Sequence, residues 1–156
     1  MANKTASTPS ADEALRLDNQ LCFALYSASL TMTKLYKPLL AELGLTYPQY
    51  LVMLVLWEQD GQTVSELGAR LALDSGTLTP LLKRMETAGL LARTRAAEDE
   101  RRVVITLTPA GQKLKVQAAS LPACMLAASQ CSLPELQALV KQVQTLRQSL
   151  ASAETT

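Results

Sequence analysis

The chain has 156 residues, of which 48% are hydrophobic and 19% charged, and its net charge is +1. This composition is typical of one folded domain and argues against a disordered chain. Three cysteines without a CxxC pair, and the absence of histidine, argue against a disulfide framework, a zinc site and a Ser-His-Asp hydrolase. No metal or cofactor is therefore expected. The charge does not exclude DNA as a partner, because the segment from Lys83 to Arg102 is basic and phosphates respond to the local field.

The first fourteen residues are small and polar, so residues 1–14 are expected to form a flexible tail. They lack the apolar segment of a cleavable secretion signal. The longest apolar run, Tyr50 to Trp57, is too short to span a bilayer. We therefore expect a cytoplasmic protein without a membrane partner.

Helical periodicity begins at about Leu15 and continues to about Leu43, after which Gly44 closes the helix. Thr46 and Gln49 have the spacing of a capping box and predict the start of a second helix. This second helix is apolar on nearly all sides and should be buried. The first helix carries one apolar stripe, formed by Leu21, Leu25, Met32, Leu35 and Leu39.

The next segment has the pattern of a helix-turn-helix. Residues 63–73 predict its first helix, with Thr63 and Glu66 as a capping box. A second amphipathic helix follows and ends at Gly89. Its polar face offers Thr79 and Lys83, which are suited to base edges and phosphates. Its apolar face has the spacing of a helix buried on one side, with Leu78, Leu81, Leu82 and Met85.

Two strands follow this helix, Leu90 to Arg95 and Arg101 to Leu107, and the polar turn AAEDE joins them. Arginines stand at both shoulders of this hairpin. A hairpin of this kind after a recognition helix is the layout of a winged helix, which predicts DNA binding. A solvated helix face beside an ordinary hairpin would give the same pattern.

Thr108 and Pro109 predict the start of a helix that runs to about Gln130. Ser132 and Glu135 have the spacing of a cap for a final helix, which carries apolar residues at the three- and four-residue steps of a coiled-coil seam. The seam could pack within the subunit, but helix-turn-helix proteins usually read two half-sites as a two-fold dimer. The predicted fold class is mostly α with a small β-hairpin wing. Residues 46–108 would form the winged helix-turn-helix DNA-binding domain, and residues 15–45 and 109–152 the dimerisation helices.

The sequence LDSGTLTPLLKRMETAGLL followed by RTRAAEDERRVVITLT resembles the multiple-antibiotic-resistance regulator (MarR) family, including the D-x-R of its wing. The resemblance implies a transcriptional regulator that binds double-stranded operator DNA as a homodimer. The expected DNA-binding residues are Ser75, Thr77, Thr79 and Lys83 in the major groove, Arg84 on phosphate or at the helix end, and Arg95, Asp99 and Arg101 in the wing, where Asp99 would orient Arg101.

The stretch LDNQLCFALYSASLTMTKLYKPLLAELGLTYPQYLVMLVLWE resembles the organic hydroperoxide resistance repressors (OhrR), a redox-sensing branch of the same family. Together with the DNA-binding module, this similarity extends from Leu15 to about Leu121. It implies that Cys22 reacts with the peroxide and that Tyr36 and Tyr47 hydrogen-bond to it. A thiolate attacks the O–O bond, and phenols can stabilise it. Without the resemblance, the cysteine and the tyrosines would be interpreted as ordinary packing residues.

OhrR proteins of the two-cysteine kind carry a resolving cysteine in the C-terminal region, where this chain has Cys124 and Cys131. No motif decides between them. Cys131 is favoured because it lies at a helix boundary, and an intersubunit disulfide is expected. The implied function is a repressor that leaves its operator when an organic hydroperoxide oxidises Cys22. One alternative is a repressor released by a phenolic or aromatic ligand, with Cys22 structural. A thiol peroxidase is disfavoured because the chain has no recycling CxxC.

Overall fold

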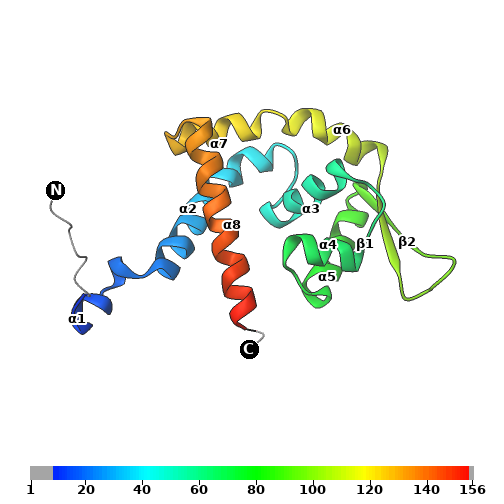
Figure 1. The fold of residues 1–156 in the computed structure, drawn as a ribbon. Helices are drawn as coiled ribbons and strands as arrows, with labels where there is room; N and C mark the ends of the chain where they lie inside the picture. The colour runs from blue at the N-terminus through cyan, green and yellow to red at the C-terminus, as the bar shows by residue number, and fades with distance from the viewer. Residues whose placement is uncertain (1–8, 155–156) are drawn as a thin grey trace.

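The computed structural model of the protein describes residues 9–154. It is mostly helical with a small three-stranded sheet, which confirms the predicted fold class (Figure 1). Of the expected tail, residues 1–8 lie outside the described part, and the rest includes a short helix. The elements in chain order are α1 (Ala11–Ala14), a 3-10 helix (Leu17–Asn19), α2 (Leu21–Ala41), α3 (Tyr47–Glu58), β1 (Gln62–Thr63), α4 (Val64–Leu71), α5 (Ser75–Thr87), β2 (Leu91–Arg95), β3 (Val103–Leu107), α6 (Pro109–Ala118), α7 (Leu121–Ser129) and α8 (Leu133–Ala153).

Side-chain caps start the helices where the sequence predicts them. In each predicted capping box the hydroxyl accepts the backbone N–H three residues on, and the Glu or Gln side chain accepts the N–H of the cap residue. Thr108 caps α6 in front of Pro109, also as predicted. The confirmed boxes are Thr46 with Gln49, Thr63 with Glu66, and Ser132 with Glu135.

These caps predict a stability that decreases in acid. Hydrogen bonds from the backbone and hydroxyl of Thr63 lower the pKa of Glu66 from its ordinary value of 4.5, and bonds from Ser132 lower that of Glu135. A lowered pKa means that the folded state binds fewer protons than the unfolded state, so this stabilisation is present above about pH 4.5 and is lost as the pH falls further. At pH values below about 4.5, we expect unfolding to require less urea, so that the midpoint of the urea transition decreases. Glu66→Gln, which can keep the box but does not titrate, should show a smaller fall; an equal fall would contradict the assignment.

Two helix boundaries differ from the prediction. The helix expected from Leu15 begins at Leu21, because Gln20 is extended and its amide donates back to the carbonyl oxygens of Ala14 and Arg16 at 2.6 and 3.0 Å. The helix expected to reach Gln130 is divided into α6 and α7. Pro122, in the first turn of α7, has no N–H to continue the preceding helix.

The sheet has the antiparallel order β1-β3-β2, with Arg95 opposite Val103 at the end of the hairpin next to its turn. Asp60 accepts hydrogen bonds from the backbone of Gly61 and Leu107, both at 2.9 Å, and so holds the start of β1 near β3. The core lies between the sheet and α3 to α5. Its fully buried side chains include Val52, Met53, Leu56, Leu67, Leu78, Leu82, Met85 and Ile105.

The two long outer helices are much less buried than this core. Within the described chain, α8 has no buried residue and α2 has Leu40 alone. In Figure 1 the N-terminal part of α2 extends away from the core formed by α3 to α5 and the sheet, and α8 crosses α2. Large apolar side chains on both helices are exposed, among them Leu21, Phe23, Leu30, Met32, Leu139, Val140 and Leu150.

Candidate nucleic-acid interface and cysteine site

Helix α5 presents one polar side to solvent. Asp74 caps it by accepting the backbone N–H of Thr77 at 2.8 Å, a cap that was not among those predicted from the sequence. The hydroxyl of Thr77 also donates to Asp74, at 3.1 Å. Thr77 therefore stabilises the helix start, and its oxygen can still accept a hydrogen bond. Of the other predicted contacts on α5, Thr79 is half-buried and Ser75, Lys83 and Arg84 are exposed.

The wing extends from the core as a two-stranded ribbon (Figure 1). Arg95, Asp99 and Arg101 are all exposed on it. Asp99 accepts the backbone N–H of Arg101 at 3.0 Å, and its carbonyl oxygen accepts the N–H of Arg102 at 2.9 Å. The prediction that Asp99 orients the guanidinium of Arg101 stays a prediction, because in this structure the Asp99 carboxylate bonds the backbone of Arg101. Asp99 fixes the backbone of the turn, and the Arg101 side chain extends from that turn.

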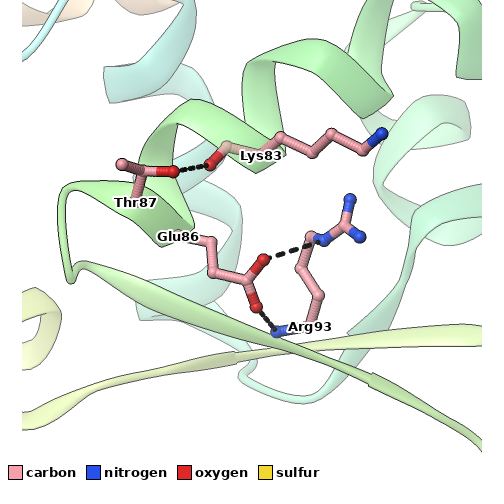
Figure 2. A network of polar contacts seen from close by, with 4 residues as sticks. All are labelled: Lys83, Glu86, Thr87 and Arg93. Carbon is pink, nitrogen blue, oxygen red and sulfur yellow. Dashed lines mark hydrogen bonds and ion pairs between the residues drawn. The ribbon is translucent and has the colours of Figure 1, made fainter.

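A contact that the sequence did not indicate joins α5 to the wing (Figure 2). One oxygen of Glu86 accepts the backbone N–H of Arg93 at 3.0 Å, and the other lies 3.3 Å from Arg93 Nε. The buried Nε is close enough for an ion pair but is not aligned for a hydrogen bond. The two residues are seven positions apart on different elements, so no helical or strand period connects them.

Tyr36, Tyr47 and Tyr50 form an aromatic cluster where α2 meets α3. The ring centres of Tyr36 and Tyr47 are 5.0 Å apart, and those of Tyr36 and Tyr50 are 5.7 Å apart. Burial, with smaller contributions from Tyr50 and Tyr47, raises the pKa of Tyr36 to about 12. Burial also raises the pKa of Tyr47. Both phenols therefore keep their protons at neutral pH, and neither hydroxyl hydrogen-bonds to another described residue.

Cys22 lies far from this cluster within one subunit. It is exposed in the first turn of α2, fourteen residues before Tyr36 on the same helix. A rise of 1.5 Å per residue separates the two by about 21 Å along the axis. Tyr47, on α3, packs against Tyr36. The structure thus brings the two tyrosines together but does not bring them to the cysteine of their own chain.

The two C-terminal cysteines have different surroundings. Cys124 is exposed within α7, whereas Cys131 is half-buried in the turn between α7 and α8. The backbone N–H of Cys131 donates to the hydroxyl of Ser129 at 3.2 Å, and its thiol donates to the Ser129 carbonyl at 3.4 Å. The preceding residue, Gln130, is left-handed, with φ of 56°. All three cysteines of the chain are free thiols in this structure.

An apolar groove of about 920 Å³ lies between α2 and α8. Its walls include Leu25, Met32, Tyr47, Leu139 and Val143. Within residues 9–154, no group of three or more His, Cys, Asp or Glu side chains is placed to hold a metal ion. In the same range no helix is long and apolar enough to cross a membrane.

The fold and its polar recognition helix define a winged helix-turn-helix regulator, and the comparisons with known proteins agree. A family model described as transcriptional regulator SarA/Rot matches residues 34–118. The organic hydroperoxide resistance transcriptional regulator of Bacillus subtilis (strain 168) is 52% identical over 136 residues, which cover 87% of this chain and 92% of that protein. The chain belongs to the MarR-type transcriptional regulators, in their organic hydroperoxide resistance branch, and is not an enzyme.

Two solved structures extend the comparison. Reduced AbfR bound to DNA matches with a TM-score of 0.69 and 39% identity over 89% of this chain and 98% of that one. Disulfide-formed AbfR matches with a lower TM-score of 0.58, at 40% identity over 86% of this chain and 95% of that one. Overoxidized AbfR bound to DNA matches with a TM-score of 0.75, at 36% identity over 91% of this chain and 99% of that one, so the present fold resembles both DNA-bound forms more than the disulfide form.

Proposed function

We propose that the protein is a homodimeric, cytoplasmic repressor that binds double-stranded operator DNA and is released from it when an organic hydroperoxide oxidises Cys22. One observation carries the proposal: a reactive residue type and two phenol donors are present, but about 21 Å along α2 separates Cys22 from Tyr36 of the same chain, and Tyr47 packs against Tyr36. A second copy of the chain could supply the tyrosines of one subunit to the cysteine of the other.

The exposed apolar faces of α2 and α8 support this dimer. Leu139 is 51% exposed and Leu30 is 48% exposed, which is unfavourable for large aliphatic side chains in water. Packing α2 and α8 against the same helices of a second copy would bury both faces in an isologous interface. It would also leave the two α5 helices free to enter successive major grooves.

DNA binding would use the exposed residues of α5 and the wing. Ser75, Thr79 and Lys83 can reach base edges and phosphates in the major groove, with Thr77 as an acceptor and Arg84 toward the backbone. Arg95 and Arg101 would contact the minor groove or its phosphates, with Asp99 holding the turn between them. AbfR, which is similar in fold, has been solved bound to DNA, which supports DNA binding by this chain.

The redox step follows from thiol chemistry. The Cys22 thiolate attacks one peroxide oxygen, the O–O bond breaks, and an alcohol leaves after protonation while Cys22 becomes a sulfenic acid. Tyr36 and Tyr47 of the second subunit would donate hydrogen bonds to the thiolate, because their raised pKa values keep them protonated. A thiol from the C-terminal region, with Cys131 favoured over Cys124, then attacks the Cys22 sulfur and releases water, which leaves an intersubunit disulfide.

Release of DNA by peroxide tests the proposal. An operator duplex is first selected from a random-sequence library with the reduced protein, and its binding is measured before and after one equivalent of cumene hydroperoxide. We expect tight binding before treatment, loss after it, and recovery with a dithiol reductant. Binding that survives full oxidation of the protein would contradict the proposal. The apolar groove between α2 and α8 would then make an aromatic or phenolic effector the better explanation.

A further inference from the structure

The contact between Glu86 and Arg93 leaves most of the Arg93 guanidinium unused. The Glu86 carboxylate accepts a hydrogen bond from the backbone N–H of Arg93 and lies beside its Nε. No described residue accepts a hydrogen bond from either Nη nitrogen of Arg93. The side chain of Arg93 is 24% exposed, so its stem is covered while its end can reach solvent. An arginine held in this way has lost much of its rotamer freedom before any ligand arrives.

Lys83 adds a second cation at the same place. It lies three residues before Glu86 on α5, so the two side chains share one face of the helix. Its ammonium hydrogen-bonds to no described residue, and only its carbonyl oxygen is used, by the hydroxyl of Thr87 at 3.0 Å. In Figure 2 the Arg93 side chain rises toward that of Lys83, and both charged ends lie to the right of the Glu86 carboxylate. Two cations and one carboxylate leave a net charge of +1 with unpaired donors.

We propose that Arg93 and Lys83 bind one backbone phosphate of DNA at the edge of the major groove, and that Glu86 is the positioning residue that holds Arg93 for it. This inference rests on the proposed DNA binding. A phosphate fits because its oxygens accept several N–H donors at once, and the planar guanidinium can give two of them in parallel. Phosphates line the groove that a recognition helix enters, so a site between α5 and the wing would fix both elements on the same strand.

The first test measures salt dependence with the operator duplex selected above and the full-length reduced protein. Arg93→Met and Lys83→Met should each weaken binding about tenfold, and should weaken binding to an unrelated duplex by the same factor. If the two cations share one phosphate, the double variant lowers the slope of log K against log salt by about one; separate phosphates would lower it by about two. Lys113→Met, on α6, removes the same charge outside the helix-turn-helix and wing and should leave the slope unchanged.

The second test measures whether Glu86→Gln tightens or weakens DNA binding. If Glu86 acted only through its negative charge near DNA, removing that charge would tighten binding. If it positions Arg93, Glu86→Gln weakens binding several-fold in the normal chain and tightens it only in the Arg93→Met background. Should Arg93→Met fail to fold, Arg93→Lys, which keeps the charge but not the planar fork, replaces it.

The possible results separately test the positioning role of Glu86, the phosphate site and the proposed function. Tighter binding by Glu86→Gln in the normal chain overturns its positioning role. Normal binding by both Arg93→Met and Lys83→Met overturns the phosphate site while leaving the proposed function intact. Absence of binding by the unmodified protein would instead overturn the proposed function itself.

Discussion

Replacing Cys22 by serine is expected to abolish the release of operator DNA by organic hydroperoxides while reduced binding stays within about twofold of the unmodified protein. The reason is positional. Cys22 is exposed at the start of α2, outside the helix-turn-helix and the wing, so the substitution removes a nucleophile without touching the DNA-binding surface. A serine hydroxyl stays protonated at neutral pH and does not attack the O–O bond at a useful rate. Fluorescence anisotropy of a labelled operator, before and after one equivalent of cumene hydroperoxide, measures both effects.

Cys124→Ser is the matched control for this experiment, because it removes another exposed thiol from the same chain. Its peroxide response should resemble that of the unmodified protein if Cys131 resolves. Cys131→Ser should still form the sulfenic acid, which a dimedone adduct at Cys22 would reveal by mass spectrometry, but should not form the disulfide. Continued release of DNA from Cys22→Ser would show that oxidation acts through another residue.

In mixed dimers, the rate at which Cys22 reacts with hydroperoxide should show whether the tyrosines contact the cysteine of the partner or that of their own chain. We expect a large difference in this rate between the two arrangements. One chain carries Cys22→Ser, and the other carries Tyr36→Phe and Tyr47→Phe. If the tyrosines serve the partner's cysteine, the single Cys22 of this dimer faces two intact tyrosines and reacts at the normal rate per thiol. Hydrogen bonds to a charged group contribute about 1.5–3 kcal/mol each, so two of them contribute about 3–6 kcal/mol, and the homodimer that lacks both tyrosines should react about 10²- to 10⁴-fold more slowly. Co-expression with two affinity tags isolates the mixed dimer, and loss of the Cys22 thiol with excess hydroperoxide gives the rate.

The control pairs a Cys22→Ser chain with an unmodified chain, which has one normal site in either arrangement and should react at the normal rate. If the mixed dimer reacted as slowly as the homodimer that lacks both tyrosines, each chain would use its own tyrosines. That arrangement would require α2 to bend sharply between residues 22 and 36. Phenylalanine retains the ring contacts of the cluster, so a change in rate reports the hydroxyls rather than the packing.

Elements set by neighbouring residues were predictable from the sequence. The hydroxyl and carboxylate or amide of each capping box are three positions apart, and the wing strands alternate within five residues, so local spacing fixed them. The break before Leu21 was missed because it depends on the amide of Gln20 reaching back to Ala14. The strand β1 was missed because two residues have no period, and they pair with a strand more than forty positions later.

The residues of the candidate site also fall into two groups, those that local spacing predicts and those whose contacts depend on the tertiary fold. Exposed polar residues on α5 and the wing followed from amphipathic spacing, and the structure leaves them accessible. Glu86 and Arg93 could not be paired from the sequence, because their contact depends on how the hairpin folds back along α5. The distance between Cys22 and the tyrosines was obtainable in principle, since a helix predicted through both positions already implies their separation. The sequence interpretation named these residues together without making that calculation.

The lack of burial along α8 has a consequence for how the cell sets the amount of this regulator. No residue of α8 is buried in its own subunit, so in the proposed dimer the order of this helix would be coupled to meeting a second chain. At low synthesis rates newly made chains would spend longer single, with frayed ends open to proteases, and would be removed before pairing. The gene's output would then rise more steeply than its transcription, because surviving protein grows with the frequency of encounters between chains. Degradation of unpaired subunits would thus sharpen the threshold between a repressed and an unrepressed operator.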